Sequence, residues 1–268
     1  MILIDNTAAL RLAIQYPYPA LLIDIGKRRY LVIADLHIGF EYELAKYGVK
    51  LPVQYNKLLS NIGNLLDQTK PTHFVILGDV KHSVSGIAPI EISGLVDILQ
   101  FLSERVDRVI IVPGNHDGSL DQLVYSLRLE NVTIASRRGS VIRGTSIGIF
   151  HGHIRPASHV FRRDTLVMAH IHPVIVIRST FGYVMRVPVW VKARLSKSRR
   201  KLLILPAFNE LVGGVSIDRV LSSGSSLRIP IAIDIKSVEL YTTEGDFLGS
   251  LQWLRDKGLV GSAYLSQA

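Results

Sequence analysis

The chain has 268 residues and a formal net charge of +9, with 48% hydrophobic and 20% charged residues. This composition suits a large buried core, and the absence of cysteine excludes disulfides and thiolate metal ligands. No apolar run reaches the ~18 residues that a membrane-spanning helix needs, and no basic start precedes an apolar block. We therefore expect a cytoplasmic protein without a membrane partner, in which any metal is held by His, Asp, Glu or Asn.

The positive charge is concentrated in the second half of the chain. Residues 1–134 carry 12 Lys and Arg against 14 Asp and Glu, whereas residues 135–268 carry 19 against 8. This asymmetry is typical of proteins with an anionic partner such as nucleic acid. A solvated basic surface would have the same composition, so the charge alone leaves both interpretations open.

Six short apolar segments are predicted to be strands covered on both faces, because they are rich in Val, Ile and Leu without clear alternation. They are residues 20–26, 29–35, 73–79, 108–114, 146–152 and 164–170. Amphipathic helical spacing falls between them, at residues 53–68 and 90–105. Strands that alternate with helices predict an α/β fold.

After about residue 173 the pattern changes to strands joined by turns. We predict strands at 179–195 and 201–208 around a basic turn, then at 226–235 and 237–245, and a last helix at 248–258. No repeat or convincing linker interrupts the chain. A single domain over residues 1–268 is therefore expected, with a motif-bearing core at about 20–175 and later strands, 180–268, that complete a second sheet.

Five of the predicted strands end in side chains that can bind metal ions. These stretches are Asp35-Leu36-His37, Asp79 with His82, Asn115-His116-Asp117, His151-Gly152-His153 and His170-Ile171-His172. Each alone would be interpreted as a cap or a surface turn. Five in succession indicate a site, because ligands bind at the carboxyl ends of strands in open α/β sheets. Carboxylate, imidazole and amide groups suit Mn, Fe or Zn rather than Ca, and their number suits two ions.

These stretches resemble the ordered signature of the calcineurin-like metallophosphoesterases: DxH, GDxx(D/H), GNH(D/E), a His usually followed by Gly, and GHxH. The likeness spans about residues 20–175. ADLHIG at 34–39 and ILPAFNELVGG at 204–214 extend it, and both are similar to the ICC-like predicted phosphoesterases. One branch of that group is associated with bacterial DNA ligases. The resemblance thus implies a DNA-repair protein or ligase as a partner.

The resemblance implies a four-layer α/β sandwich of two facing mixed β-sheets with flanking helices. It also implies two divalent metal ions, with Mn²⁺ preferred and Fe, Ni or Zn as alternatives. A hydroxide held between the two ions would be the nucleophile. Asp35, His37 and His172 would hold the first ion, Asn115, His151 and His170 the second, and Asp79 would bridge them. His116 would stabilise the transition state or protonate the leaving oxygen.

Two residues depart from the usual signature. Ala169 stands where glycine is usual, and His82 stands where protein phosphatases have an aspartate. A histidine at the second place is what the double-strand-break repair nucleases of the superfamily have, which favours diesters. Asp117 is expected either to orient its neighbours or to stabilise the turn. His153 is expected to face the substrate or to be a solvated loop residue.

The expected function is hydrolysis of phosphodiester bonds in nucleic acid or nucleotides. A phosphomonoesterase, a cyclic-nucleotide phosphodiesterase and a protein-binding scaffold without activity are the alternatives. Arg155 is a candidate substrate contact, and other basic residues near the signature could bind a DNA or RNA backbone or simply face water. These residues are Arg137, Arg138, Arg162, Arg163, Arg186, Lys192, Arg194, Lys197, Arg199, Arg200 and Lys201.

Overall fold

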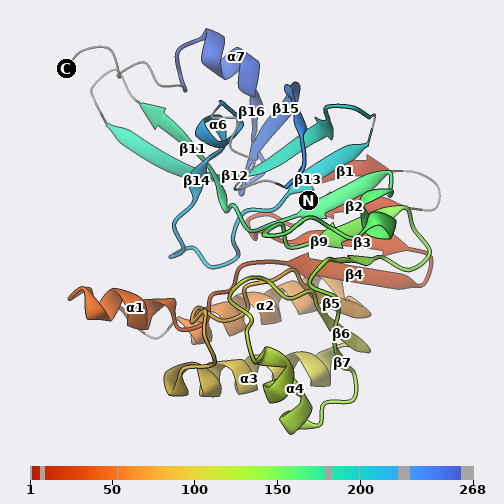
Figure 1. Ribbon diagram of the computed structural model, residues 1–268, viewed down its shortest axis with the longest axis vertical. Helices are drawn as coiled ribbons and strands as arrows, with labels where there is room; N and C mark the ends of the chain where they lie inside the picture. Colours follow the sequence, from red (N-terminus) through yellow and green to blue (C-terminus); the bar gives the residue numbers. More distant parts are fainter. Residues whose placement is uncertain are drawn as a thin grey trace.

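The computed structural model describes residues 2–6, 10–52, 54–178, 183–198, 200–222 and 230–260. Two β-sheets lie face to face, and helices cover the outer side of each sheet (Figure 1). In these ranges no helix combines the length and the apolar character needed to cross a membrane.

The first sheet contains seven strands in chain order, antiparallel from β1 to β4 and parallel from β4 to β7. The strands are β1 (Ile2–Asn6), β2 (Arg11–Ile14), β3 (Leu21–Ile25), β4 (Arg28–Ile33), β5 (His73–Ile76), β6 (Arg108–Ile111) and β7 (Val132–Ile134). The helices between them are α1 (Phe40–Lys46), α2 (Tyr55–Thr69), α3 (Pro89–Arg105) and α4 (Leu120–Leu127).

The second sheet contains nine strands, with β9, β10 and β13 parallel at its centre. The strands are β8 (Ser140–Val141), β9 (Ile147–Phe150), β10 (Thr165–Met168), β11 (Pro173–Arg178), β12 (Val184–Leu195), β13 (Lys201–Ile204), β14 (Val215–Ser216), β15 (Ile233–Thr242) and β16 (Phe247–Ser250). The accompanying helices are α5 (Ser158–Phe161), α6 (Ile217–Ser222) and α7 (Leu251–Asp256).

Alternate residues of each central strand enter different cores, and this produces the layers. Val32 and Val167 meet in the core between the two sheets, whereas Ile33 packs with α2 and α3. Met168 packs in a third core with Leu251 of α7. Three cores separate four layers, helix, sheet, sheet and helix, so the predicted fold class is confirmed. A single domain over 1–268 stays a prediction.

Several predicted boundaries were wrong by a few residues. β4, β5 and β10 end at Ile33, Ile76 and Met168, before the polar residues that the predicted strands included. The reason is that the backbone turns left-handed just beyond each strand end, which breaks the ladder. The predicted last helix, 248–258, divides into the end of β16 and α7. Residues 179–182 and 226–229 of two predicted strands, and Arg199, lie outside the described residues.

Candidate metal centre

The polar strand ends of both sheets meet at one place. Asp35 and Asp79 follow β4 and β5 of the first sheet, and His151 and His170 follow β9 and β10 of the second. The backbone N–H of His170 donates to Asp35 Oδ2 at 3.3 Å, and His151 Nδ1 donates to the Leu77 carbonyl oxygen at 2.9 Å. Hydrogen bonds across the two sheets thus hold the cluster in place.

Three groups of side chains have ligand atoms within 4.8 Å of one another; one is His37, His82 and His116, and the other two are sets made of the expected ligands. One set is Asp35, His37, Asp79 and His172, and the other is Asp79, His151 and His170. Asp79 belongs to both, because its Oδ2 lies 3.3 Å from His151 Nε2 and 3.6 Å from His37 Nε2. The structure therefore brings six of the seven expected ligands together, in the two sets that the family resemblance implies.

Asn115 is the seventh predicted ligand, and its side chain is exposed. It follows Gly114, whose backbone packs so closely on Asp79 that a Cβ there would lie 2.1 Å from Asp79 Oδ1. Within the described residues, the Asn115 amide makes no hydrogen bond to the other six. Its role as a ligand stays a prediction.

Backbone strain is concentrated at the same residues. Among the described residues, eight non-glycine positions have a positive φ, and five of them are Asp35, His37, Asp79, His170 and His172. Such conformations cost about 1–3 kcal/mol each and persist where the surroundings impose them, most often at functional sites. The fold therefore holds these side chains in place at the expense of stability.

Unsatisfied buried atoms show that the two sets fit metal ions. Seven buried side-chain atoms of the described residues make no hydrogen bond, and five of them belong to the sets. They are Asp35 Oδ1, His37 Nε2, His151 Nε2, His170 Nδ1 and His172 Nε2. One such atom costs about 1–3 kcal/mol. Five that converge are expected where divalent cations complete the site, and oxygen and imidazole ligands suit Mn, Fe or Zn.

The ligand histidines differ in how readily they are neutral and able to bind a cation. Burial lowers the pKa of His37 to about 3 and that of His170 to about 4, so both imidazoles are neutral and can bind a cation. Burial opposes ionisation of Asp35, but His172 and His151 hold its pKa below the usual value. For His151, burial is outweighed by Asp79, which raises the pKa of the imidazole to about 9. For His172, burial is likewise outweighed by Asp35, which raises the pKa of this imidazole. Binding of cations would therefore compete with protons at His151 and His172.

His116 and His82 lie beside the ligand sets and are joined to them by hydrogen bonds. His116 Nδ1 donates to the His82 carbonyl oxygen, and the His116 backbone N–H donates to Asp79 Oδ1 at 2.9 Å. His82 Nδ1 lies 3.3 Å from His37 Nδ1 and forms a hydrogen bond with it. Since a hydrogen bond on one ring nitrogen orients a metal-binding histidine, His82 is placed to orient His37.

Asp117 joins two loops of the site. It is buried, and it accepts hydrogen bonds from the backbone N–H groups of Gly114, at 2.7 Å, and Val80, at 2.8 Å. These contacts fix the loop that carries His116 against the loop that carries Asp79. The contact with Gly114 fits the expected role in stabilising the turn, and the contact with Val80 fits the expected role in orienting its neighbours.

The candidate substrate residues differ in position. The His153 ring lies 5.3 Å from the ring of His151 and 6.2 Å from that of His170, so it borders the second set. Arg155 is exposed, and its guanidinium lies over the Phe161 ring at 5.6 Å. The contact found for Arg155 is therefore with the protein itself.

The basic residues 186–201 divide between the two ends of the second sheet. β13 runs parallel to β10, with Lys201 beside Thr165 and Ile204 beside Met168. Because His170 follows Met168, Lys201 and the turn before it lie at the end of the sheet away from the site. Arg186 lies at the other end, where its guanidinium donates to the Gly214 carbonyl oxygen.

Sequence reasoning assigned no role to five further residues that support the site. Glu91 is buried, and it accepts hydrogen bonds from the backbone N–H groups of residues 82, 83 and 88. Lys81 is also buried and donates to the carbonyl oxygens of residues 83 and 116.

The other three residues belong to the segment after β13. Asn209 donates to the carbonyl oxygen of residue 36. Gly213 accepts from His172 Nδ1 at 3.0 Å, and Gly214 packs on the His172 backbone. Asn209 and the two glycines lie in the segment 204–214, whose sequence indicated only a family resemblance.

Comparison with known proteins agrees with this geometry. The model of the calcineurin-like phosphoesterase family matches residues 28–211, and the chain belongs to this family. The fold is similar to that of the nuclease MPE of Pseudomonas putida, with a TM-score of 0.55, 22% identity, and coverage of 88% of this chain and 97% of that one. The E. coli phosphoesterase Yfce matches with a TM-score of 0.40, 15% identity, and coverage of 82% and 96%. No curated protein matches by sequence.

Proposed function

We propose that this protein is a phosphodiesterase that uses two divalent metal ions, preferably Mn²⁺, to hydrolyse nucleic acid or nucleotides. The observation that carries the proposal is the pair of ligand sets that share Asp79. A shared carboxylate holds two ions close together, and such ion pairs clamp the attacking and leaving oxygens of a displacement at phosphorus. Asn115 is proposed as the further ligand of the second set.

The ions would lower the pKa of water and offset negative charge on the phosphoryl oxygens. The chain's own residues would do the rest. With Nδ1 held by the His82 carbonyl oxygen, His116 has Nε2 left to contact the substrate. We propose that His116 Nε2 donates a proton to the leaving oxygen. His82 and Asp117 are proposed to position His116. His153 and Arg155 are proposed substrate contacts.

The choice of diesters over monoesters rests on the residue at position 82. A histidine there is a similarity to the double-strand-break repair nucleases of the superfamily, and its ring stacks with that of His116 at 5.5 Å. The nuclease with a similar fold is 22% identical, so that likeness supports the fold alone. Monoesters and cyclic nucleotides are the competing substrates, and a ligase or DNA-repair partner stays a prediction.

Hydrolysis of bis(p-nitrophenyl) phosphate and p-nitrophenyl phosphate with Mn²⁺ tests the proposal. The wild type should hydrolyse the diester faster than the monoester. Asp79→Asn should lower kcat/KM by about 10²- to 10³-fold or more, because it weakens both ligand sets at once. Asp97→Asn, on the exposed face of α3, is the control and should behave as the wild type. A variant Asp79→Asn with full activity would contradict the assignment.

A further inference from the structure

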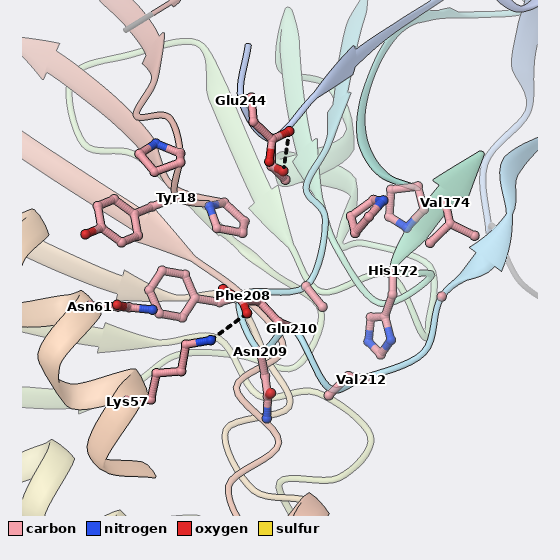
Figure 2. A pocket seen from close by; sticks show the side chains of 17 residues that line it. Tyr18, Lys57, Asn61, His172, Val174, Phe208, Asn209, Glu210, Val212 and Glu244 are labelled. Carbon is pink, nitrogen blue, oxygen red and sulfur yellow. Dashed lines mark hydrogen bonds and ion pairs between the residues drawn. The ribbon is translucent and has the colours of Figure 1, made fainter. Parts of the chain in front are cut away.

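A cavity of about 360 Å³ opens directly beside His172 (Figure 2). Both sheets contribute to it: Tyr18 comes from the turn between β2 and β3, Asn61 from α2, and Val174 from β11. The segment that carries Phe208 passes between them (Figure 2). Its volume lies in the range of pockets that bind small molecules.

Most of the residues that line the cavity are apolar, and few of them are charged. Four prolines line it together with Tyr18, Val174, Phe208 and Val212; the prolines are Pro17, Pro19, Pro173 and Pro188. Its polar groups include the Asn61 amide and the carboxylates of Glu210 and Glu244.

The charge of the lining disfavours a phosphate as occupant. Among the described residues that line the cavity, Lys57 supplies the one ammonium group, and it is paired with Glu210 at 2.6 Å. The carboxylate of Glu244 adds a negative charge that no further lysine or arginine of the described lining offsets, which disfavours an anion. An uncharged, flat group with N–H donors fits such walls, and a nucleobase has these properties.

The walls are held rigidly, as a preformed binding site requires. The turn of Tyr18 is closed by backbone hydrogen bonds from Tyr18 to Gln15 at 2.9 Å and from Ala20 to Tyr18 at 2.7 Å. The Tyr18 hydroxyl accepts a hydrogen bond from Asn64 at 3.3 Å. The Phe208 backbone N–H donates to the Ala34 carbonyl oxygen at 2.9 Å, next to the metal sets.

We infer that this cavity binds the nucleobase of the nucleotide next to the scissile phosphate. The inference rests on the proposed function and specifies its substrate. His172 connects the cavity to the candidate metal centre. It lines the cavity, and its Nε2 lies 3.2 Å from Asp35 Oδ1 in the first ligand set. A base in a duplex is paired and stacked and cannot enter, so the substrate is a single strand or a small nucleotide diester.

The first test compares two diesters that share the p-nitrophenol leaving group. One is the p-nitrophenyl ester of thymidine 5′-phosphate, and the other is methyl p-nitrophenyl phosphate, which has no base. With Mn²⁺, the wild type should prefer the nucleoside ester in kcat/KM. Tyr18→Leu should lower this preference about tenfold, since one stacking ring is lost. Val212→Phe, which fills the cavity, should lower it as well.

Tyr125→Leu is the matched control, because Tyr125 is 87% exposed on α4 and does not line the cavity. Binding of thymidine without added metal, followed by saturation-transfer NMR, gives a readout independent of activity. Binding should be retained by Tyr125→Leu and lost by Tyr18→Leu and Val212→Phe. Circular dichroism shows whether each variant is folded.

The outcomes separate the inference from the proposed function. If both diesters are hydrolysed equally and neither cavity variant changes the ratio or thymidine binding, the inference is overturned and the function stands. If neither diester is hydrolysed, the proposed function fails, while thymidine binding still decides whether the cavity holds a base.

A second comparison distinguishes the two sources of the base. Faster cleavage of a single-stranded thymidine decamer than of the dinucleotide TpT assigns the cavity to nucleic acid, and the reverse assigns it to small nucleotides. A duplex cut internally as fast as the single strand would contradict the inference.

Discussion

His151 connects metal binding to pH. Asp79 raises the pKa of this buried imidazole from the usual 6.5 to about 9 in the folded protein. A raised pKa stabilises the fold below pH 6.5, and this contribution is lost as the pH rises through about 9. A cation requires the neutral imidazole, so binding must release the proton.

We therefore predict that the affinity for Mn²⁺ increases from pH 6.5 to about 9. Calorimetric titration in buffers of different ionisation enthalpy measures the proton released on binding. At least one proton should be released near neutral pH, because the pKa of His172 is raised as well, and fewer should be released as the pH approaches 9. Binding near pH 7 without proton release would show that His151 is not protonated as described.

Lys81 is a positioning residue for the proposed proton donor. Its ammonium group is buried and donates to the carbonyl oxygens of His116 and Ser83. Lys81→Met leaves both oxygens without a partner and frees the loop of His116. We predict a kcat about 10- to 100-fold lower with KM nearly unchanged, because hydrogen-bond partners that hold a site residue in place typically contribute this much to activity. Lys27→Met, on an exposed turn, is the control. Equal kcat values for the two variants would remove Lys81 from this role.

At the scale of elements, the segment after β13 is a support for His172. Gly214 packs so closely that a Cβ would lie 2.1 Å from the His172 carbonyl oxygen, whereas a Cβ on the adjacent Gly213 would meet no atom within 4 Å. The two glycines therefore form a matched pair. Gly214→Ala should reduce stability by about 1–3 kcal/mol through overpacking, and it should weaken metal binding because His172 must shift.

Thermal unfolding and Mn²⁺ titration of both variants measure these effects. Gly213→Ala should be close to the wild type in both assays. If Gly214→Ala also unfolds and binds Mn²⁺ like the wild type, the segment does not constrain His172.

The sequence predicted the elements better than their ends. Long amphipathic stretches such as α2 and α3 and the apolar strands were predictable because burial repeats along them. The strand ends were not, since the left-handed backbone at Asp79 is imposed by packing against Gly114. Lys81 and Glu91 were missed because a buried charge looks like a surface charge until its carbonyl or N–H partners are known.

The basic turn shows the same limit. Residues 186–201 are close in sequence, but β12 carries Arg186 to one end of the sheet and Lys201 starts β13 at the other. Proximity along a chain that includes a long strand does not predict a common surface. By contrast, the six clustered ligands follow strands whose carboxyl ends meet, so their positions after the strands were sufficient to predict a common site. Their division into two sets was implied by the family resemblance.

At the scale of the whole molecule, the candidate metal centre joins the two sheets. Asp35 and Asp79 belong to the first sheet, and His151, His170 and His172 belong to the second. Metal ions should therefore stabilise the association of the sheets. At 100 times the Kd, one bound ion adds about 2.7 kcal/mol, which for a chain of this size raises Tm by about 5–10 °C.

Differential scanning calorimetry with and without EDTA measures this stabilisation. The Tm of Asp79→Asn should respond little to Mn²⁺, whereas Asp97→Asn should respond as the wild type does. An increase in Tm that persists in Asp79→Asn would place the stabilising ion elsewhere.

The proposed metal centre holds two ions that share Asp79, and counting the bound ions tests this arrangement. Mn²⁺ bound per chain is measured by equilibrium dialysis, and electron paramagnetic resonance reports whether the bound ions interact. We predict two Mn²⁺ per wild-type chain with a spin-coupled spectrum, and loss of the coupling together with diesterase activity in Asp79→Asn. A single Mn²⁺ per fully active chain, or two uncoupled ions, would contradict the account.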